Sequence, residues 1–321
     1  MLYQLNEVGK IKNLNNAKIA QLVEHNLAKV RVAGSNPVFR SKGLNKPLFF
    51  LYRFLYYSIV SVILLNKMPN DFFSFKKFTI YQDRCAMKVG TDGVLLGVLA
   101  PVIIGENNLS VAENPESQLK ILDIGTGTGL VAIMLAQRCH GRAVVVGVEI
   151  DRDAATQAQE NADATDWQIK IHNASVQSFT DNTNEKFDLI VSNPPYFINS
   201  LKAPDKSRNT ARHTDELSFQ DLVHCVSKLL SDEGKFSVII PYSSEKDFIK
   251  IADSKNLFAE SLVRVIPKIG KEPKRSVITF CKQMENSNCN INVTELVIET
   301  ENRHCYTEEF KSLTADFYLK H

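Results

Sequence analysis

Short apolar runs alternate with helix-length amphipathic stretches from residue 119 onward. Apolar runs bounded by turn residues predict buried strands, and the stretches between them predict helices that cover a parallel sheet. The expected strands are 119–124, 143–149, 169–172, 187–192, 235–241, 262–266 and 276–282, with helices at 130–138, 152–165, 217–230 and 244–255. A loop with proline and glycine joins the last two strands, which predicts an antiparallel end to the sheet. The turn-like 231–234 is expected to separate a helix from the strand after it.

Charge is distributed unevenly along the chain. Residues 1–67 contain 10 Lys and Arg against 2 acidic residues, whereas residues 68–321 contain 28 against 34. A nucleic-acid partner is therefore expected to contact a local basic face, because the net charge of the main part is negative.

The six cysteines include no C-x-x-C pair and no zinc-like spacing to histidine, which predicts no metal site and a reducing, cytoplasmic setting.

The first 67 residues have two interpretations. Residues 47–65 approach the length and apolarity of a membrane span, although Arg53 interrupts them. The favoured alternative is a transfer-RNA gene and spacer translated by mistake: residues 20–24, 26–30 and 34–37 can be back-translated into sequences resembling a D-arm, an anticodon stem-loop and a T-arm. We then expect translation to start at Met68. Intact-mass measurement of the native protein distinguishes the two, since the full-chain mass contradicts the second.

Three regions are therefore expected. Residues 1–67 are a non-native extension, residues 68–284 form the main domain, and residues 285–321 form a tail that packs on it. Within the tail, 293–299 is a candidate strand and 308–319 a short amphipathic helix. Neither a stable protein partner nor a membrane association is expected.

A glycine-rich loop follows the first strand of the main domain. Gly125, Gly127 and Gly129 separate that strand from a helix, and such glycines permit positive φ and close approach of a ligand. Leu130 stands where a dinucleotide fingerprint has its third glycine, which disfavours NAD and FAD. Asp123 is expected to accept from a cationic amino-acid group. Glu149, which ends the next strand, is expected to bind ribose hydroxyls. The structural alternative is a tight turn flanked by solvated acids.

At these positions the chain resembles the class I methyltransferases. The resemblance implies a Rossmann-like, mostly parallel seven-stranded sheet with helices on both faces and an antiparallel last strand. It also implies S-adenosylmethionine as cofactor. Many such enzymes have an acidic residue after the third strand to contact the adenine of the cofactor. Here the segment is 172–176, with Asn173, Ala174 and Ser175 as candidates.

A second loop, Asn193-Pro194-Pro195-Tyr196, follows the strand 187–192 at the same expected edge of the sheet. An exocyclic amine is a poor nucleophile because its lone pair is delocalised into the ring. The Asn193 side-chain oxygen and the Pro194 carbonyl can accept its protons and favour a pyramidal nitrogen, while both prolines rigidify the loop. Tyr196 can stack on a planar base. The structural alternative is a plain turn after a strand.

The segment 78–97, the Asn-Pro-Pro-Tyr loop and Pro273-Lys274-Arg275 together resemble the bacterial tRNA adenine N6-methyltransferases that act on position 37 of a valine tRNA. The most specific part is 84–97, and the resemblance spans about residues 75–283. It implies that Lys88, Thr91 and Asp92 cover the cofactor or admit the base; the structural alternative is a packed helix with a turn at Gly90. Candidate RNA-binding residues, which could equally form solvated faces, are Lys88, Lys202, Lys206, Arg208, Arg212, His213, Lys268, Lys271, Lys274 and Arg275.

Other functions use the same loop. Guanine N2 methylation of ribosomal RNA, adenine N6 methylation of DNA and glutamine N5 methylation of a release factor all present a planar amine to such acceptors. Residues 84–97 and the lack of a separate DNA-recognition domain favour tRNA. A non-catalytic RNA-binding protein is a further alternative, and it need not bind S-adenosylmethionine.

Overall fold

The computed structural model describes residues 71–102, 118–195, 217–282, 291–302 and 304–320. The chain divides at Met68 into two units, and only the second, Pro69–His321, contains described residues. The expected extension 1–67, with its apolar stretch 47–65, therefore lies outside them. Among the described residues no helix is long and apolar enough to cross a membrane.

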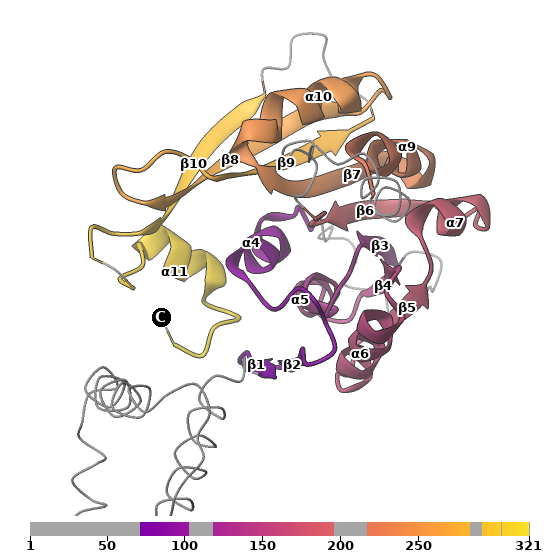
Figure 1. Ribbon diagram of the computed structural model, residues 1–321, viewed down its shortest axis with the longest axis horizontal. Coiled ribbons are helices and arrows are strands. Elements are labelled where there is room, and N and C mark those ends of the chain that lie inside the picture. Colours follow the sequence, from indigo (N-terminus) through magenta and orange to yellow (C-terminus); the bar gives the residue numbers. More distant parts are fainter. Residues whose placement is uncertain (1–70, 103–117, 196–216, 283–290, 303, 321) are drawn as a thin grey trace, which may run out of the picture. The chain divides into compact units, whose positions relative to one another are not determined.

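One eight-stranded sheet organises the second unit (Figure 1). Its strand order is β10-β8-β9-β7-β6-β3-β4-β5, and the strands are β3 (Leu119–Ile124), β4 (Ala143–Glu149), β5 (Ile169–Asn173), β6 (Phe187–Ser192), β7 (Leu230–Pro241), β8 (Phe258–Lys268), β9 (Arg275–Cys281) and β10 (Asn292–Glu299). Strand β9 is antiparallel to both neighbours, and the other pairings are parallel. The carboxyl ends of β3, β4, β5, β6 and β7 therefore meet at one edge.

Helices cover both faces of the sheet, as expected (Figure 1). On one face lie α4 (Thr91–Leu99), α5 (Leu130–Arg138), α6 (Arg152–Asp163) and α11 (Glu308–Thr314); on the other lie α7 (Val176–Asp181), α9 (Phe219–Leu229) and α10 (Glu245–Asp253), which follows the 3₁₀ turn η4 (Tyr242–Ser244). Each face encloses its own hydrophobic core. The strands are apolar on both sides because both faces are covered.

Side-chain caps fix where the site-forming helices begin. The Asp151 carboxylate accepts a hydrogen bond from the Ala154 backbone N–H (2.8 Å) at the start of α6, directly after β4. Ser218 caps α9 by accepting from the Asp221 N–H (3.1 Å). A cap of this kind contributes about 1 kcal/mol. It also fixes the direction in which each helix leaves the sheet edge.

Two expectations need correction. The sheet has eight strands and not seven, because β10 from the tail pairs in parallel with β8 and buries Leu296. Residues 231–234 do not end an element; β7 continues through them as a bulge, since Phe187 pairs with Leu230 but Leu189 pairs with Lys235. The backbone at Gly234 approaches β6 so closely that an added Cβ would lie 2.9 Å from the Phe187 carbonyl. A turn-like composition here therefore marks an irregular strand.

The tail meets an N-terminal hairpin of β1 (Phe72–Ser74) and β2 (Thr79–Tyr81). The Phe75 and Tyr318 rings stack with centroids 5.8 Å apart, and the Lys76 N–H donates to the Phe317 carbonyl (2.8 Å). The two ends of the second unit thus close against each other beside α4 and α5.

Candidate active site

The two loops chosen from the sequence lie side by side. Ile124 ends β3, Ser192 ends β6, and these two residues are register partners. The buried Ser192 hydroxyl donates to the Ile124 carbonyl (2.9 Å), which ties the two strand ends together. The next residues, Gly125 and Asn193, line the same cavity. Parallel pairing therefore brings residues 68 positions apart into one site.

The glycine loop needs its glycines for two reasons. Gly125, Gly127 and Gly129 have φ values of 71°, 56° and 81°, in the left-handed region. An added Cβ at Gly125 would meet nothing within 4 Å, so the backbone there faces open space. At Gly129 a Cβ would lie 3.3 Å from the Ala158 carbonyl of α6. The first glycine leaves room for a ligand, and the third lets the loop pack on a helix.

Asp123 lies beneath this loop. Its side chain is buried and accepts hydrogen bonds from the Thr126 hydroxyl (2.6 Å) and the Ala132 N–H (3.2 Å). Loss of hydration on burial raises the pKa of this carboxyl to about 7, although both hydrogen bonds oppose the shift. Asp123 does not line the cavity. Its observed contacts are those of a residue that holds the loop in shape.

Glu149 connects the glycine loop to the end of β4. One carboxylate oxygen accepts from the Gly127 N–H (2.9 Å) and the other from the Asp151 N–H (2.9 Å). Each oxygen retains a second lone pair, and the side chain lines the cavity. Glu149 can therefore hold the loop and accept from the hydroxyls of a bound ribose at the same time.

The cavity has a volume of about 390 Å³, within the range of small-molecule sites. It is lined by Cys85, Ala86, Met87, Ile124, Gly125, Gly127, Val148, Glu149, Ile150, Asp151, Ala154, Ala174, Ser175, Val176, Gln177, Asn193, Pro195 and Leu217. Most of the wall is apolar, and its polar side chains include the carboxylates of Glu149 and Asp151 and the amide of Asn193. Open backbone at Gly125, an acceptor at Glu149 and apolar walls suit a nucleoside that carries a sulfonium-containing chain. The described residues thus fit S-adenosylmethionine.

Asn173, which is expected near the adenine of the cofactor, ends β5 and contacts the backbone that follows β4. The Asn173 amide donates to the carbonyls of Glu149 and Ile150 (both 3.0 Å), and the Ala174 N–H donates to the Glu149 carbonyl (3.0 Å). Asn173 therefore supports the backbone after β4. Ala174 and Ser175, which line the cavity, are the wall that this segment offers to a ligand.

The Asn-Pro-Pro-Tyr loop is described only through Pro195. Asn193 is partly exposed, Pro194 is buried and Pro195 is exposed. Asn193 and Pro195 line the cavity. Tyr196 and the basic residues Lys202, Lys206, Arg208, Arg212 and His213 lie outside the described residues.

Part of the segment 84–97 forms one wall of the cavity. Thr91 and Asp92 begin α4, yet neither lines the cavity; its wall here consists of Cys85, Ala86 and Met87. The sequence indicated that the segment 84–97 belongs to the site. It could not show which apolar residues of the segment line the cavity and which pack inside the protein. Asp92 instead accepts from Arg275 Nε (2.8 Å).

That ion pair changes the interpretation of the basic loop between β8 and β9. The Arg275 guanidinium is engaged by Asp92 and by the Lys274 carbonyl (3.0 Å), so it is part of the protein's internal contacts. Lys88, Lys271 and Lys274 are exposed. Their side chains can reach a polyanion.

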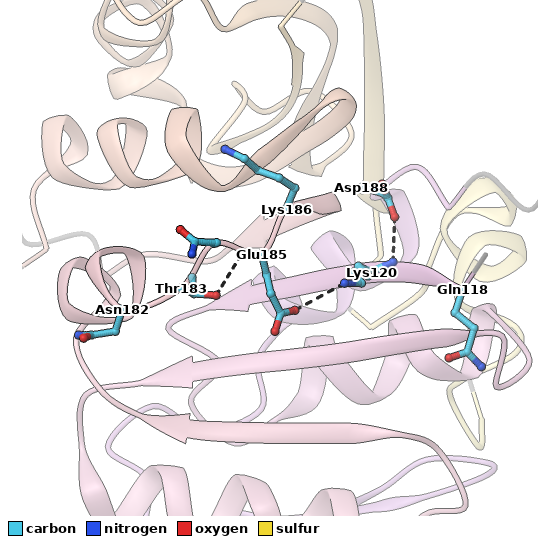
Figure 2. A pocket seen from close by; sticks show the side chains of 8 residues that line it. Gln118, Lys120, Asn182, Thr183, Glu185, Lys186 and Asp188 are labelled. Carbon is cyan, nitrogen blue, oxygen red and sulfur yellow. Dashed lines mark hydrogen bonds and ion pairs between the residues drawn. The ribbon is translucent and has the colours of Figure 1, made fainter. Parts of the chain in front are cut away.

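A larger hollow, of about 650 Å³, lies at the opposite end of the sheet, where β3 and β6 begin (Figure 2). Figure 2 shows Lys120 between Glu185 and Asp188. The Lys120 ammonium is 3.8 Å from the Glu185 carboxylate, and the Lys120 backbone N–H donates to the Asp188 carboxylate (2.9 Å). Ligands of open α/β sheets bind at the carboxyl ends of strands. The smaller cavity, which holds both loops, is therefore the candidate site.

No group of three or more His, Cys, Asp or Glu side chains in the described part of the chain could hold a metal ion. The chemistry available at the site comes from backbone amides, two carboxylates, the asparagine and the apolar wall.

Comparison with known proteins shows what this chain is similar to. Residues 107–240 match the family model of the methyltransferase small domain. A predicted O-methyltransferase from Agrobacterium tumefaciens, protein Atu636, has a similar fold, with a TM-score of 0.51 at 18% identity over 70% of this chain and 96% of that one.

Curated relatives are much more similar. The tRNA1(Val) (adenine(37)-N6)-methyltransferase of Bacteroides fragilis is 48% identical over 259 residues, which cover 79% of this chain and 100% of the relative. Proteins of the same name are 47% identical in Phocaeicola vulgatus, over 78% of this chain and 99% of the relative, and 42% identical in Flavobacterium johnsoniae, over 77% and 99%. Identity of this extent, together with the two juxtaposed loops, shows that the chain belongs to the family of tRNA1(Val) (adenine(37)-N6)-methyltransferases.

Proposed function

We propose that this protein transfers a methyl group from S-adenosylmethionine to N6 of adenine 37 in the anticodon loop of a valine tRNA. The observation that carries the proposal is that Gly125 and Asn193, which follow the paired strand ends Ile124 and Ser192, line one cavity. The name shared by the curated relatives supplies the substrate.

The cofactor site is assigned residue by residue. Gly125 and Gly127 allow the cofactor to approach the protein backbone closely, and Glu149 accepts from the ribose hydroxyls. Asp123 and Gly129 hold the loop in place, and Asn173 supports the segment whose Ala174 flanks the ligand. Thr91, the exposed first residue of α4, helps to cover the bound cofactor.

Catalysis in this site depends on alignment. Bound S-adenosylmethionine supplies an electrophilic methyl group. The Asn193 side-chain oxygen and the Pro194 carbonyl accept the two amine protons, which directs the nitrogen lone pair towards the methyl carbon. Pro194 and Pro195 restrict the loop so that these acceptors are preorganised, and Tyr196 stacks on the adenine. The surplus proton leaves the product nitrogen for water, so no strong base is required.

The substrate reaches the site as RNA. A base beside an anticodon is partly unpaired and costs little to splay out. Lys88 and Lys274, which are exposed, contact phosphates, together with Lys202, Lys206, Arg208 and Arg212. Arg275 contributes by holding Asp92. We place this activity in the cytoplasm, with tRNA as the partner and no stable protein partner.

The enzyme itself is assigned to residues 68–284 with the tail 285–321. The relatives align over their full or nearly full lengths while about a fifth of this chain has no counterpart, and residues 1–67 make up a fifth of it. We assign residues 1–67 to a non-native extension. The intact mass of the native protein tests this.

Methylation of total tRNA that lacks the mark tests the function. The product nucleoside is identified by mass spectrometry and mapped by nuclease digestion. We expect N6-methyladenosine at position 37 of valine tRNA. A methylated guanine or glutamine, or a product in DNA alone, would assign the same site to another amino methyltransferase. Cofactor binding without any product would indicate a non-catalytic RNA-binding protein.

A further inference from the structure

Helix α6 carries two amide side chains that are buried although they belong to a polar residue type. Gln157 and Asn161 are each 1% exposed. They are four residues apart, so they lie on one face of the helix, next to Ala158 and its contact with Gly129. Buried amides must find hydrogen-bond partners, and both find theirs in segments that form the cofactor cavity.

Asn161 joins the N-terminal hairpin to the glycine loop. Its side-chain oxygen accepts from the Tyr81 N–H (2.9 Å), and its NH₂ donates to the carbonyls of Tyr81 (2.8 Å) and Thr128 (2.9 Å). Both donor hydrogens and one acceptor site are therefore used. One side chain fixes the end of β2 relative to Gly127 and Gly129.

Gln157 holds the segment that follows. We name residues 82–89 the strap. The Gln157 oxygen accepts from the Arg84 N–H (3.0 Å), and its NH₂ donates to the Asp83 carboxylate (2.6 Å). Gln82 closes the strap by accepting from the Val89 N–H (2.7 Å). The middle of the strap is the cavity wall formed by residues 85–87.

The strap buries little apolar surface. Asp83, Arg84, Ala86, Met87 and Lys88 are exposed, and only Cys85 among the apolar residues of 83–88 is buried. A segment with few buried apolar contacts takes its position from its hydrogen bonds. The hydrogen bond from Gln157 is also the largest cause that lowers the pKa of Asp83, which keeps that carboxylate ionised as an acceptor.

We propose that Gln157 and Asn161 are positioning residues for the cofactor, because they fasten the strap and the glycine loop to one helix and so set the width of the cavity between them. This inference rests on the proposed S-adenosylmethionine site. Neither side chain lines the cavity, so both act through the segments that they hold.

The test uses the full chain and a reversal of donor and acceptor. In Gln157→Glu a carboxylate faces the Asp83 carboxylate, which should push the strap away. In the double variant Asp83→Asn with Gln157→Glu, the new amide donates to the new carboxylate and the contact is restored. Asp83→Ala removes the same contact from the exposed side and leaves the core unchanged. Glu160→Ala is the matched control, since it breaks the exposed Arg84–Glu160 ion pair between the same strap and the same helix.

We measure the dissociation constant for S-adenosylmethionine by calorimetry, kcat at saturating cofactor, and the Tm of the free protein. We expect Gln157→Glu and Asp83→Ala to weaken binding about 10-fold, with kcat within about 3-fold. The double variant should recover to within about 3-fold of the wild type, and Glu160→Ala should change binding less than about 2-fold.

Three results would overturn the inference: unchanged binding in Asp83→Ala, no recovery in the double variant, or an equal loss in Glu160→Ala. If Gln157→Glu fails to fold, Asp83→Ala and the double variant decide. A wild-type protein that does not bind S-adenosylmethionine contradicts the proposed function itself, which separates the two failures.

Discussion

The glycine loop after β3 and the catalytic loop after β6 end neighbouring strands of one sheet, yet the protein treats them differently. The carboxylates of Asp123 and Glu149 accept from the Thr126 hydroxyl and the Gly127 N–H. The Asn161 amide donates to the Thr128 carbonyl of the same glycine loop. The catalytic loop leaves β6 beside the Ser192–Ile124 hydrogen bond and presents Asn193 to the cavity. The first loop is held by side chains from other elements, and the second places its asparagine on the cavity wall.

This difference predicts a separation of kinetic effects. Changes around the glycine loop should alter cofactor affinity or stability and leave kcat at saturating cofactor nearly intact. Changes in the catalytic loop should lower kcat and leave cofactor affinity nearly intact. A variant that moves both together would weaken the comparison.

The largest effect is expected for Asn193→Ala. Loss of an acceptor that acts on the amine in the transition state should lower kcat about 100- to 1000-fold. The dissociation constant of S-adenosylmethionine should stay within about 3-fold, because the ribose and loop contacts persist. Methyl transfer to unmodified valine tRNA and calorimetry measure the two quantities.

Asn184→Ala is the control for that change. Asn184 is an exposed asparagine shortly before β6, and it lines the hollow at the opposite end of the sheet. We expect normal turnover. Retained activity in Asn193→Ala would contradict the mechanism, and lost activity in both would point to a general loss of structure.

Glu149→Gln should act on the other loop. A glutamine has one side-chain oxygen, so it cannot accept from both the Gly127 and the Asp151 N–H, and it would direct an NH₂ group at one of them. We expect binding of S-adenosylmethionine to weaken about 10- to 100-fold. With saturating cofactor, kcat should remain within about 3-fold of the wild type. A loss confined to kcat would show that the two loops are not separable.

Asp123→Asn tests whether the buried carboxylate holds the loop or contacts the cofactor. Its folded-state pKa of about 7 lies above the ordinary value, so the folded protein binds the proton more tightly than the unfolded chain. The wild type therefore loses stability as pH rises from about 4 to about 7, whereas the variant, which has no ionisable group at this position, does not. The stability advantage of the variant should grow by about 2–3 kcal/mol between about pH 5 and about pH 8.

Thermal unfolding of the free protein at the two pH values measures this change. Asparagine keeps an acceptor for Thr126 and Ala132, so cofactor binding should change less than about 3-fold. A large loss of affinity would instead support a direct contact between Asp123 and the cationic part of the cofactor.

The sequence located both loops because each is a contiguous motif after a buried strand. Gly125 and Asn193 could be placed at one edge since parallel strands share their carboxyl ends. Contacts between distant segments left no local pattern: Gln157 meets the strap 73 residues away, and Arg275 meets Asp92 across 183 residues. Asn161 would have been assigned to solvent or to the helix surface by its residue type alone.

The pairing of the edge strand β10 could also not be predicted from the sequence. The candidate strand 293–299 was identified, but its partner was not, because a short apolar run fits any open edge. Its parallel pairing with β8 follows from burial of Leu296 against the core of α4 and α11. Residues 231–234 looked like a turn because serine, aspartate and glycine favour turns, and the close approach of Gly234 to β6 fits a bulge equally well.

The smallest effect is expected for Lys274→Ala, which tests the substrate side of the comparison. The Lys274 side chain is exposed, whereas its carbonyl accepts from Tyr242 and Arg275, so its removal should leave the loop intact. Loss of one phosphate contact should raise KM for tRNA about 2- to 4-fold and reduce the slope of log affinity against log salt by about 1. The affinity for S-adenosylmethionine should not change.

Lys271→Ala, three residues away in the same exposed loop, shows whether the effect belongs to one contact or to the charge of the loop. An unchanged salt slope in both variants would remove this loop from the RNA interface and leave phosphate binding to Lys88 and residues 202–212.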